Sequence, residues 1–136
     1  MKLTNGHVAE FMFAGNALFT LVSTKTGTHF TYKIQKKEEG PFFVKVLTGP
    51  DNTEDYRYAG FIPANGQLMG EGQVVRGKKG MDPKAPSMVA LNWFLRHMGS
   101  DAVEVYHEGR CGRCGRTLTV PESIERGIGP DCAEKM

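Results

Sequence analysis

The chain has 136 residues, of which 40% are hydrophobic and 24% charged, and its formal net charge is +2. This length fits one domain with at most a small appendage, and the near balance of charge excludes a strongly acidic nucleic-acid mimic and a strongly basic coat protein. No apolar run approaches the roughly 20 residues of a membrane-spanning helix, and the amino terminus lacks the apolar region of a signal peptide. Three cysteines, an odd number, argue against a secreted disulfide scaffold. We therefore expect a cytoplasmic protein.

The first half of the chain alternates apolar and polar residues. Residues 7–15, HVAEFMFAG, fit either a short helix that ends at Gly15 or an additional strand. Further on, Phe30, Tyr32 and Ile34 fall on one face of an extended segment, as alternation in a strand requires. Turn signals such as KTG and GPDN separate the segments. We predict an antiparallel meander of four or five strands at residues 17–24, 28–35, 41–48, 55–62 and 67–72.

One main helix follows a loop at residues 74–86. We predict the helix at about 83–98, with Asp82 as its N-cap and Pro83 at its first position, or with a start nearer Pro86. Its apolar residues share one face, which should lie on the sheet: Met88, Leu91, Phe94, Leu95 and Met98. A short strand at 102–107 then leads into the cysteine segment. The fold class is therefore α+β, with a sheet-and-helix domain at 1–101 and a finger at 102–136.

All three cysteines lie in one segment, HEGRCGRCGRTLTVPESIERGIGPDC, at residues 107–132. Cys111 and Cys114 form a C-x-x-C-G turn, a spacing that lets two thiolates meet on one ion. Cys132 follows after seventeen intervening residues, and Pro130 just before it suits the first turn of a helix, whose dipole favours a thiolate. Because thiolate ligands select zinc over magnesium or calcium, the segment predicts one structural zinc ion per chain.

Structural zinc sites usually have four ligands, so the three cysteines need a partner. We expect His107, which completes the pattern H-x3-C-x2-C-x17-C, a Cys3His set. Other candidates are Asp131, Glu134, a water molecule or a histidine elsewhere in the fold. The competing interpretation is a reduced C-x-x-C with an unrelated third cysteine, but a thioredoxin-like motif would need a βαβ context that the sequence does not show.

The rest of the segment predicts a very small folding unit. Pro121 should begin a short helix that Gly127 ends, with a core of Leu118, Ile124 and Ile128. Such a unit, a zinc ribbon or treble-clef-like finger, is too small to fold alone, so the metal should supply much of its folding energy.

The motif C-x2-C-G-R, then P-x-S-I, then G-I-G-P-x-C resembles the carboxy-terminal domain of a family of uncharacterised bacteriophage and bacterial proteins. The resemblance covers residues 107–132 closely. It implies a zinc finger and a phage or prophage origin, and it supplies no activity.

Basic residues indicate where a partner would bind. The cysteine segment carries Arg110, Arg113 and Arg116, and phosphate contact by a zinc finger is the functional interpretation. Residues 107–136 hold five basic and five acidic residues, however, so solvated arginines packed on the finger are an equal alternative. A second basic region contributes Lys36, Lys37, Lys78 and Lys79. We expect four aromatic residues to belong to the core, because a chain this small needs them inside, and a surface that stacks on bases is the alternative: Phe42, Phe43, Tyr56 and Tyr58.

No catalytic motif is present: the sequence lacks a G-x-S-x-G elbow, a Walker loop and an H-E-x-x-H pair. We therefore expect a non-catalytic module, with nucleic acid as its leading partner. The alternative is a protein-binding phage factor that inhibits a host defence complex, such as a CRISPR effector. A metal-dependent nuclease is the third hypothesis. Phosphate-driven affinity should collapse as salt rises, whereas a protein interface should lose far less.

Overall fold

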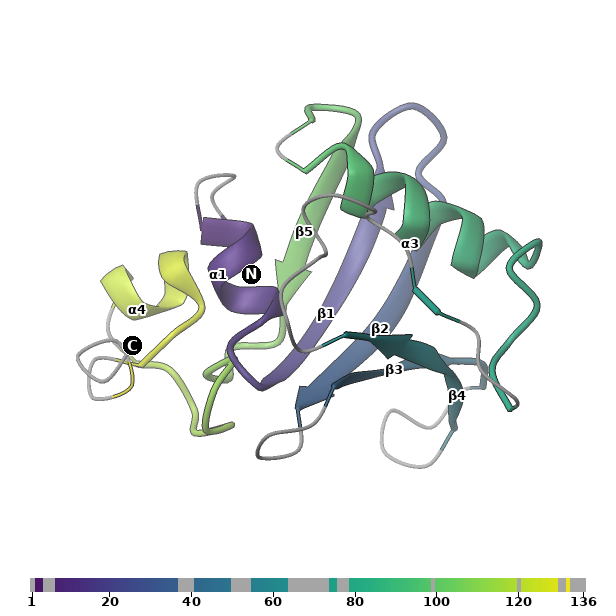
Figure 1. Ribbon diagram of the computed structural model, residues 1–136. Coiled ribbons are helices and arrows are strands. Elements are labelled where there is room, and N and C mark those ends of the chain that lie inside the picture. The colour runs from purple at the N-terminus through teal and green to yellow at the C-terminus, as the bar shows by residue number, and fades with distance from the viewer. Residues whose placement is uncertain are drawn as a thin grey trace.

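In a computed structural model, five antiparallel strands form one sheet in the order β4-β3-β2-β1-β5, and the described part of the chain adds the helices α1, α3 and α4 (Figure 1). The structure describes residues 2–3, 7–36, 41–49, 55–63, 74–75, 79–98, 100–119, 121–129 and 132. The strands are β1 (Asn16–Ser23), β2 (His29–Lys36), β3 (Phe42–Leu47), β4 (Tyr56–Ile62) and β5 (Val103–His107). The helices are α1 (Val8–Met12), α3 (Pro86–Arg96) and α4 (Pro121–Arg126). The predicted α+β class is confirmed.

Strands β1 to β4 form the predicted meander, in which each strand pairs with the next one along the chain. Strand β5 returns after α3 and pairs with the other side of β1, from Phe19 opposite His107 to Ser23 opposite Val103. The predicted strand at 67–72 lies outside the described residues. Nearby, Val75 and Phe61 exchange two backbone hydrogen bonds of 2.8 and 2.9 Å, so the expected loop begins with a bridge to β4.

Alternation gives the sheet an inner and an outer face. The inner face carries the core, and Phe19, Tyr32 and Val44 on it are fully buried. Helix α3 lies on this face (Figure 1), and the hydroxyl of Tyr32 donates a 2.6 Å hydrogen bond to the carbonyl of Ser87. Met88, Leu91, Phe94 and Leu95 are buried against the sheet, as their spacing predicts. No helix in the described part of the chain is long and apolar enough to cross a membrane.

Helix α3 begins at Pro86, the alternative start, and the prediction of Asp82 as its N-cap is wrong. Asp82 instead closes a separate turn, because its Oδ1 accepts the N–H of Lys84 (2.9 Å) and its carbonyl accepts the N–H of Ala85 (2.9 Å). Proline disfavours a helical conformation in the residue before it, which explains why Ala85 is extended and the helix starts at the second proline. The helix ends at Arg96, two residues before the expected Met98.

The ambiguous segment at 7–15 forms the short helix α1, whose residues Val8, Phe11 and Met12 are buried. Phe11 joins the sheet to the cysteine segment. Its ring lies edge-on to that of Phe19, with centroids 6.5 Å apart, and 5.7 Å from the ring of His107. Figure 1 shows α1 between α4 and the sheet. The cysteine segment thus packs on the amino-terminal helix, while the division into domains at residue 101 stays a prediction.

Gly127 ends α4 in the left-handed conformation, with φ +79°. A Cβ atom at this position would overlap the Phe11 ring and lie 2.9 Å from Cδ2 of Leu3. We expect Gly127→Ala to cost about 3 kcal/mol of unfolding free energy, from backbone strain and overpacking together. Gly27 is the matched control, because its φ is +75° and nothing lies within 4 Å of its Cβ position, so Gly27→Ala should cost only about 1 kcal/mol. Equal losses in denaturant titrations of the two variants would contradict this packing.

Candidate metal centre

A tight hairpin holds the first two cysteines. Residues Arg110 and Thr117 form a bridge, and inside it the N–H of Cys111 donates to the carbonyl of Arg116 (2.8 Å). The N–H of Gly115 then donates back to the carbonyl of Cys111 (2.9 Å). Gly115 has φ +79°, the left-handed conformation that closes this turn without steric cost. The hairpin, here called the knuckle (residues 110–117), places Cys111 and Cys114 side by side.

The chain then makes α4 and returns to the knuckle. The N–H of Gly127 bonds the carbonyl of Ser123 (2.7 Å), which ends the helix, and the N–H of Gly112 bonds the carbonyl of Gly127 (2.8 Å). This second bond fixes the returning chain against the knuckle and brings Cys132 to it. Leu118 and Ile128 are buried and Ile124 is partly buried, so the expected small core is confirmed. The predicted helix start at Pro130 lies outside the described residues.

The sulfur atoms of Cys111, Cys114 and Cys132 all lie within 4.8 Å of one another. A tetrahedral zinc–thiolate site, with zinc–sulfur distances of about 2.3 Å, places its sulfurs about 3.8 Å apart. Small adjustments therefore suffice for the three side chains to hold one ion. The Sγ of Cys111 also accepts the N–H of Gly129 (3.2 Å) and of Arg113 (3.4 Å), an arrangement that stabilises a thiolate. The three cysteines fit a metal ion, and they would supply three thiolate ligands to it.

The pKa values of the cysteine thiols also support a metal site. Burial raises the pKa of the Cys111 thiol, but backbone N–H groups, chiefly that of Gly129, outweigh it and bring the pKa to about 7. Burial and the neighbouring sulfurs of Cys114 and Cys111 raise the pKa of Cys132 to about 11. Negative charges on sulfurs at this separation repel one another, and this repulsion contributes to the raised pKa of Cys132. A bound cation removes this conflict.

The structure does not bring His107 into the sulfur cluster. His107 is buried, and its Nδ1 accepts the N–H of Gly109 (2.9 Å) while its Nε2 donates to the carbonyl of Ile124 (2.5 Å). Burial lowers the pKa of His107, which favours this neutral ring. With both nitrogens bonded to the backbone in this way, the geometry favours a structural role for His107, and its expected role as the fourth ligand stays a prediction. In the structural role His107 joins β5 to α4, and another group would complete the site. Asp131 and Glu134 lie outside the described residues.

Replacing His107 distinguishes the structural role from the ligand role. We expect His107→Ala to keep one metal ion per chain while lowering the free energy of unfolding by about 2–4 kcal/mol, because the substitution removes a buried ring and leaves two backbone groups unpaired. Metal content by native mass spectrometry and stability by thermal melting measure the two effects separately. If His107→Ala loses its metal as completely as a cysteine variant does, His107 is a ligand after all.

The cysteine cluster and the finger around it can now be compared with known proteins. Residues 101–136 match a family of unknown function (DUF6011). No match was found among curated proteins or among solved structures. The matched segment contains β5, the knuckle, α4 and all three cysteines. It is similar to an uncharacterised carboxy-terminal domain, and this similarity carries no activity. The phage origin implied by the sequence motif stays a prediction.

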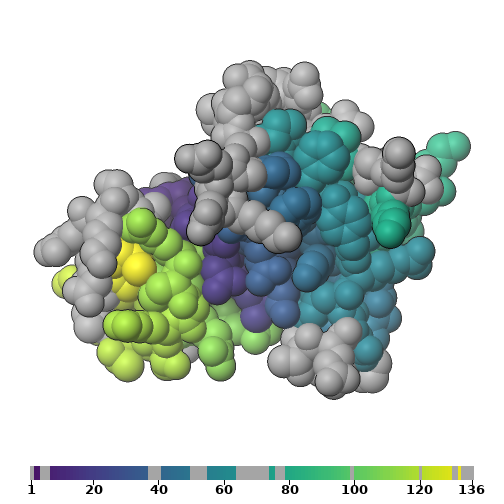
Figure 2. All heavy atoms as spheres, turned by 60° about the horizontal axis from the view of Figure 1, so that its bottom comes forward, coloured from purple at the N-terminus to yellow at the C-terminus, as the bar shows by residue number. Residues whose placement is uncertain are grey.

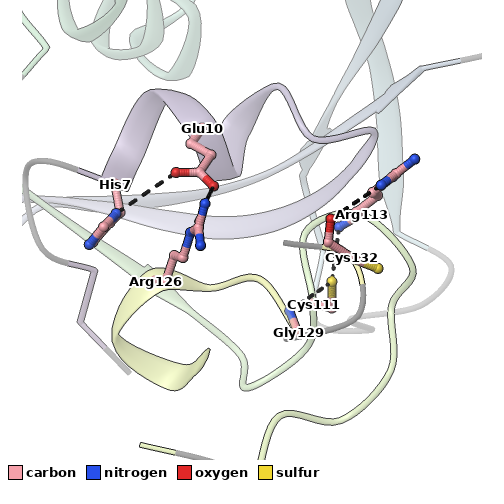
Figure 3. Close-up of polar contacts among 7 residues, drawn as sticks. All are labelled: His7, Glu10, Cys111, Arg113, Arg126, Gly129 and Cys132. Atoms are coloured by element: carbon pink, nitrogen blue, oxygen red, sulfur yellow. Dashed lines mark hydrogen bonds and ion pairs between the residues drawn. The ribbon is translucent and has the colours of Figure 1, made fainter. Parts of the chain in front are cut away.

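Within the matched segment, the arginines have different surroundings, and Figure 3 shows those of Arg113 and Arg126. Arg126 of α4 points to α1, where its Nε lies 2.7 Å from Oε1 of Glu10 and its second nitrogen bonds the same oxygen. Arg113 turns toward the third cysteine, and its guanidinium donates to the carbonyl of Cys132 (3.2 Å). Arg110 and Arg116 are exposed, and neither side chain forms a hydrogen bond or ion pair within the described residues. These two arginines are therefore available to an anionic partner.

The lysines that were expected to lie beside these arginines are found at different places in the fold. Lys36 is exposed at the end of β2, and its N–H bonds the carbonyl of Gly15 (3.0 Å), one residue before the Asn16 that contacts the knuckle. Lys79 is exposed at the far side of the sheet, just before Met81, whose N–H bonds Ala59 of β4 (3.1 Å). The structure therefore places Lys36 near the knuckle arginines and Lys79 away from them. Lys37 and Lys78 lie outside the described residues.

Sequence reasoning missed the contribution of α1 to the finger. Phe11 fills the space under Gly112 and Gly127, and Glu10 holds Arg126. A signal was present, because Val8, Phe11 and Met12 follow the i, i+3, i+4 spacing of an amphipathic helix. Five helical residues are too few to distinguish that spacing from alternation in a strand.

Proposed function

We propose that this chain is a non-catalytic nucleic-acid-binding protein whose carboxy-terminal finger is held by one structural zinc ion. The observation that carries the proposal is the knuckle itself: Arg110, Arg113 and Arg116 are all exposed on a hairpin that backbone hydrogen bonds close and that carries two of the three clustered cysteines. Arginine binds phosphate through several N–H donors, and a rigid turn places these donors without the entropy cost of ordering a flexible loop.

Zinc is the proposed ion because the donors are sulfur. Three thiolates with N–H donors to one of them match the ligand sets of structural zinc, whereas magnesium and calcium require oxygen ligands. In this proposal the ion fixes the loop that returns from α4 to the knuckle, and it takes no part in a reaction. The finger lies against α1 and the start of β1, since the N–H of Asn16 bonds the carbonyl of Gly112 (2.6 Å).

The knuckle is continuous with the sheet surface that faces away from α3. Asn16 contacts the knuckle and accepts a hydrogen bond at Oδ1 from Nε2 of Gln35 (3.4 Å), which brings the end of β2 to the same place. Figure 2 shows the finger beside β1, β2 and the following strands on one face of the molecule. Lys36 adds a positive charge near this junction. This continuity supports a binding surface larger than the knuckle alone.

A salt series tests the proposal. We expect a fluorescently labelled oligonucleotide to bind the metal-loaded protein, with log affinity falling linearly as log salt concentration rises, because each phosphate contact releases counterions. Fluorescence anisotropy at increasing salt measures the slope. Absence of binding at low salt would overturn the proposal. An affinity for the oligonucleotide that does not depend on salt would contradict recognition through phosphate contacts.

Protein binding has one observation in its favour. An apolar groove of about 370 Å³ lies between α3 and the ends of β1, β2 and β5, and Trp93 and the exposed Val89 line it. Nothing in the structure shows what covers this groove, so nucleic acid is the preferred partner. The nuclease hypothesis is tested by incubating plasmid with the metal-loaded protein, and we expect the plasmid to remain uncut.

A further inference from the structure

The outer face of β2, β3 and β4 combines aromatic and basic side chains. In β3, Phe42, Val44 and Val46 are buried on the inner face, so Phe43 and Lys45 lie on the outer face. The expectation that the aromatics are core is thus confirmed for Phe42, and it does not extend to Phe43. The rings of Phe43 and Tyr58 lie 6.2 Å apart, centre to centre, at 50° to each other.

We propose that this outer face is a stacking site for the bases of a single-stranded nucleic acid. The site comprises Gln35, Phe43, Lys45 and Tyr58, which line one hollow of about 430 Å³, and Lys33 is opposite Lys45 in the neighbouring strand. Base stacking on aromatic rings next to positive charges is the usual way in which proteins hold single strands without reading their sequence. The inference rests on the proposed function, because it names the form of nucleic acid that the chain would bind.

A charge conflict across β2 and β3 supports an anionic ligand here. Lys33 and Lys45 are directly opposite each other in the register of the two strands, and both side chains are half-buried. Like charges directly opposite one another destabilise a sheet. Neither lysine forms an ion pair within the described residues, and the Nζ of Lys33 lies 4.1 Å from the centre of the Tyr56 ring. A phosphate at this face would offset the repulsion between the two lysines.

The stacking site also lies in line with the knuckle. Gln35 is opposite Phe43 in the sheet, and its side chain bonds Asn16, whose backbone bonds Gly112 of the knuckle. A single strand with its bases on Phe43 and Tyr58 can therefore continue toward the knuckle, and Figure 2 shows the carboxy-terminal segment beside the strands on one face of the molecule. A duplex cannot stack in this way, because its bases already stack on one another and its backbone faces outward. We infer that a duplex reaches only the basic side chains.

Leucine substitutions separate the two modes of binding. We expect Phe43→Leu and Tyr58→Leu each to weaken binding of a labelled oligothymidylate by about 5- to 100-fold and to leave binding of a duplex of equal length unchanged. Leucine keeps an apolar side chain on a surface position, so the fold should persist, and thermal melting checks this. Tyr106→Leu is the matched control. Tyr106 lies on the outer face of β5, outside the hollow, and its hydroxyl donates to Glu104 (3.3 Å).

Lys45→Gln adds a readout that a purely structural role would not give. We expect this variant to bind the oligothymidylate more weakly and yet to melt at the same or a higher temperature, because the substitution removes the repulsion from Lys33. Wild-type binding of both probes with no effect of the leucine variants would overturn the stacking site and leave the proposed function intact. Binding of neither probe by the wild type would overturn both.

Discussion

Replacing Cys114 with serine is expected to remove the metal from the chain and to unfold the finger. Cys114 is exposed, and serine has nearly the same shape, so the substitution leaves no cavity and acts through the lost ligand. Structural zinc supplies most of the folding energy of a small finger. We expect a loss of about 4 kcal/mol or more in the free energy of unfolding and a fall of about 10–20 °C in the melting temperature.

The unfolding caused by Cys114→Ser should extend to a segment that is distant in the sequence. Because Phe11 packs under Gly112 and Gly127, α1 should lose protection from hydrogen exchange together with residues 107–129, while β2 and β3 remain protected. A chelator should shift the melting of the wild type and leave that of Cys114→Ser unchanged. Thr119→Ser is the control for a small substitution to serine at an exposed position in the finger that supplies no metal ligand. Normal melting of Cys114→Ser would show that the cysteines do not hold the finger together.

Removing Arg110 and Arg116 together is expected to produce the largest change in nucleic-acid binding. If each arginine contacts one phosphate, the double substitution to glutamine should make the slope of log affinity against log salt shallower by about 1.4 for a single strand and about 1.8 for a duplex. Arg113 stays in place, because its bond to the carbonyl of Cys132 helps to hold the returning chain. The variant should therefore keep its metal and its melting temperature.

A second double variant that removes the same number of positive charges controls for the overall electrostatic field of the protein. Lys25 and Arg96 are exposed, and neither lies in the finger. Their replacement by glutamine changes the net charge by the same amount, yet it should leave the salt slope unchanged. Equal effects of the two double variants would mean that binding follows net charge alone, and the knuckle would then lose its assigned role. Unchanged binding in both variants would move phosphate recognition away from the finger altogether.

The sheet and the main helix could be predicted because their signals are local. Alternation over six to eight residues determines which side chains of β1, β2 and β3 enter the core, and buried Phe19, Tyr32 and Val44 confirm it. The start of α3 was placed wrongly because Pro83 and Pro86 both suit a first helical position. Only the structure shows that Asp82 closes a turn of its own.

The candidate site was predictable where residue type determines chemistry. Three cysteines in a C-x-x-C-x17-C spacing indicate a common ligand set, and the structure gathers their sulfurs. The spacing does not determine where a side chain points. His107 lies on the inner face of β5, where β1 pairing directs its ring toward Ile124 and the core. Likewise, the contact between α1 and the finger joins residues more than one hundred positions apart, and no local pattern encodes it.

X-ray absorption at the zinc edge, on protein purified without added metal, tests the central claim most directly. The account predicts about one zinc per chain, with three sulfur neighbours at about 2.3 Å and one lighter neighbour. It also predicts the same spectrum for His107→Ala, since both ring nitrogens of His107 bond the backbone. Protein that contains no metal, or zinc with fewer than three sulfur neighbours, would contradict the claim that the three cysteines hold one zinc ion.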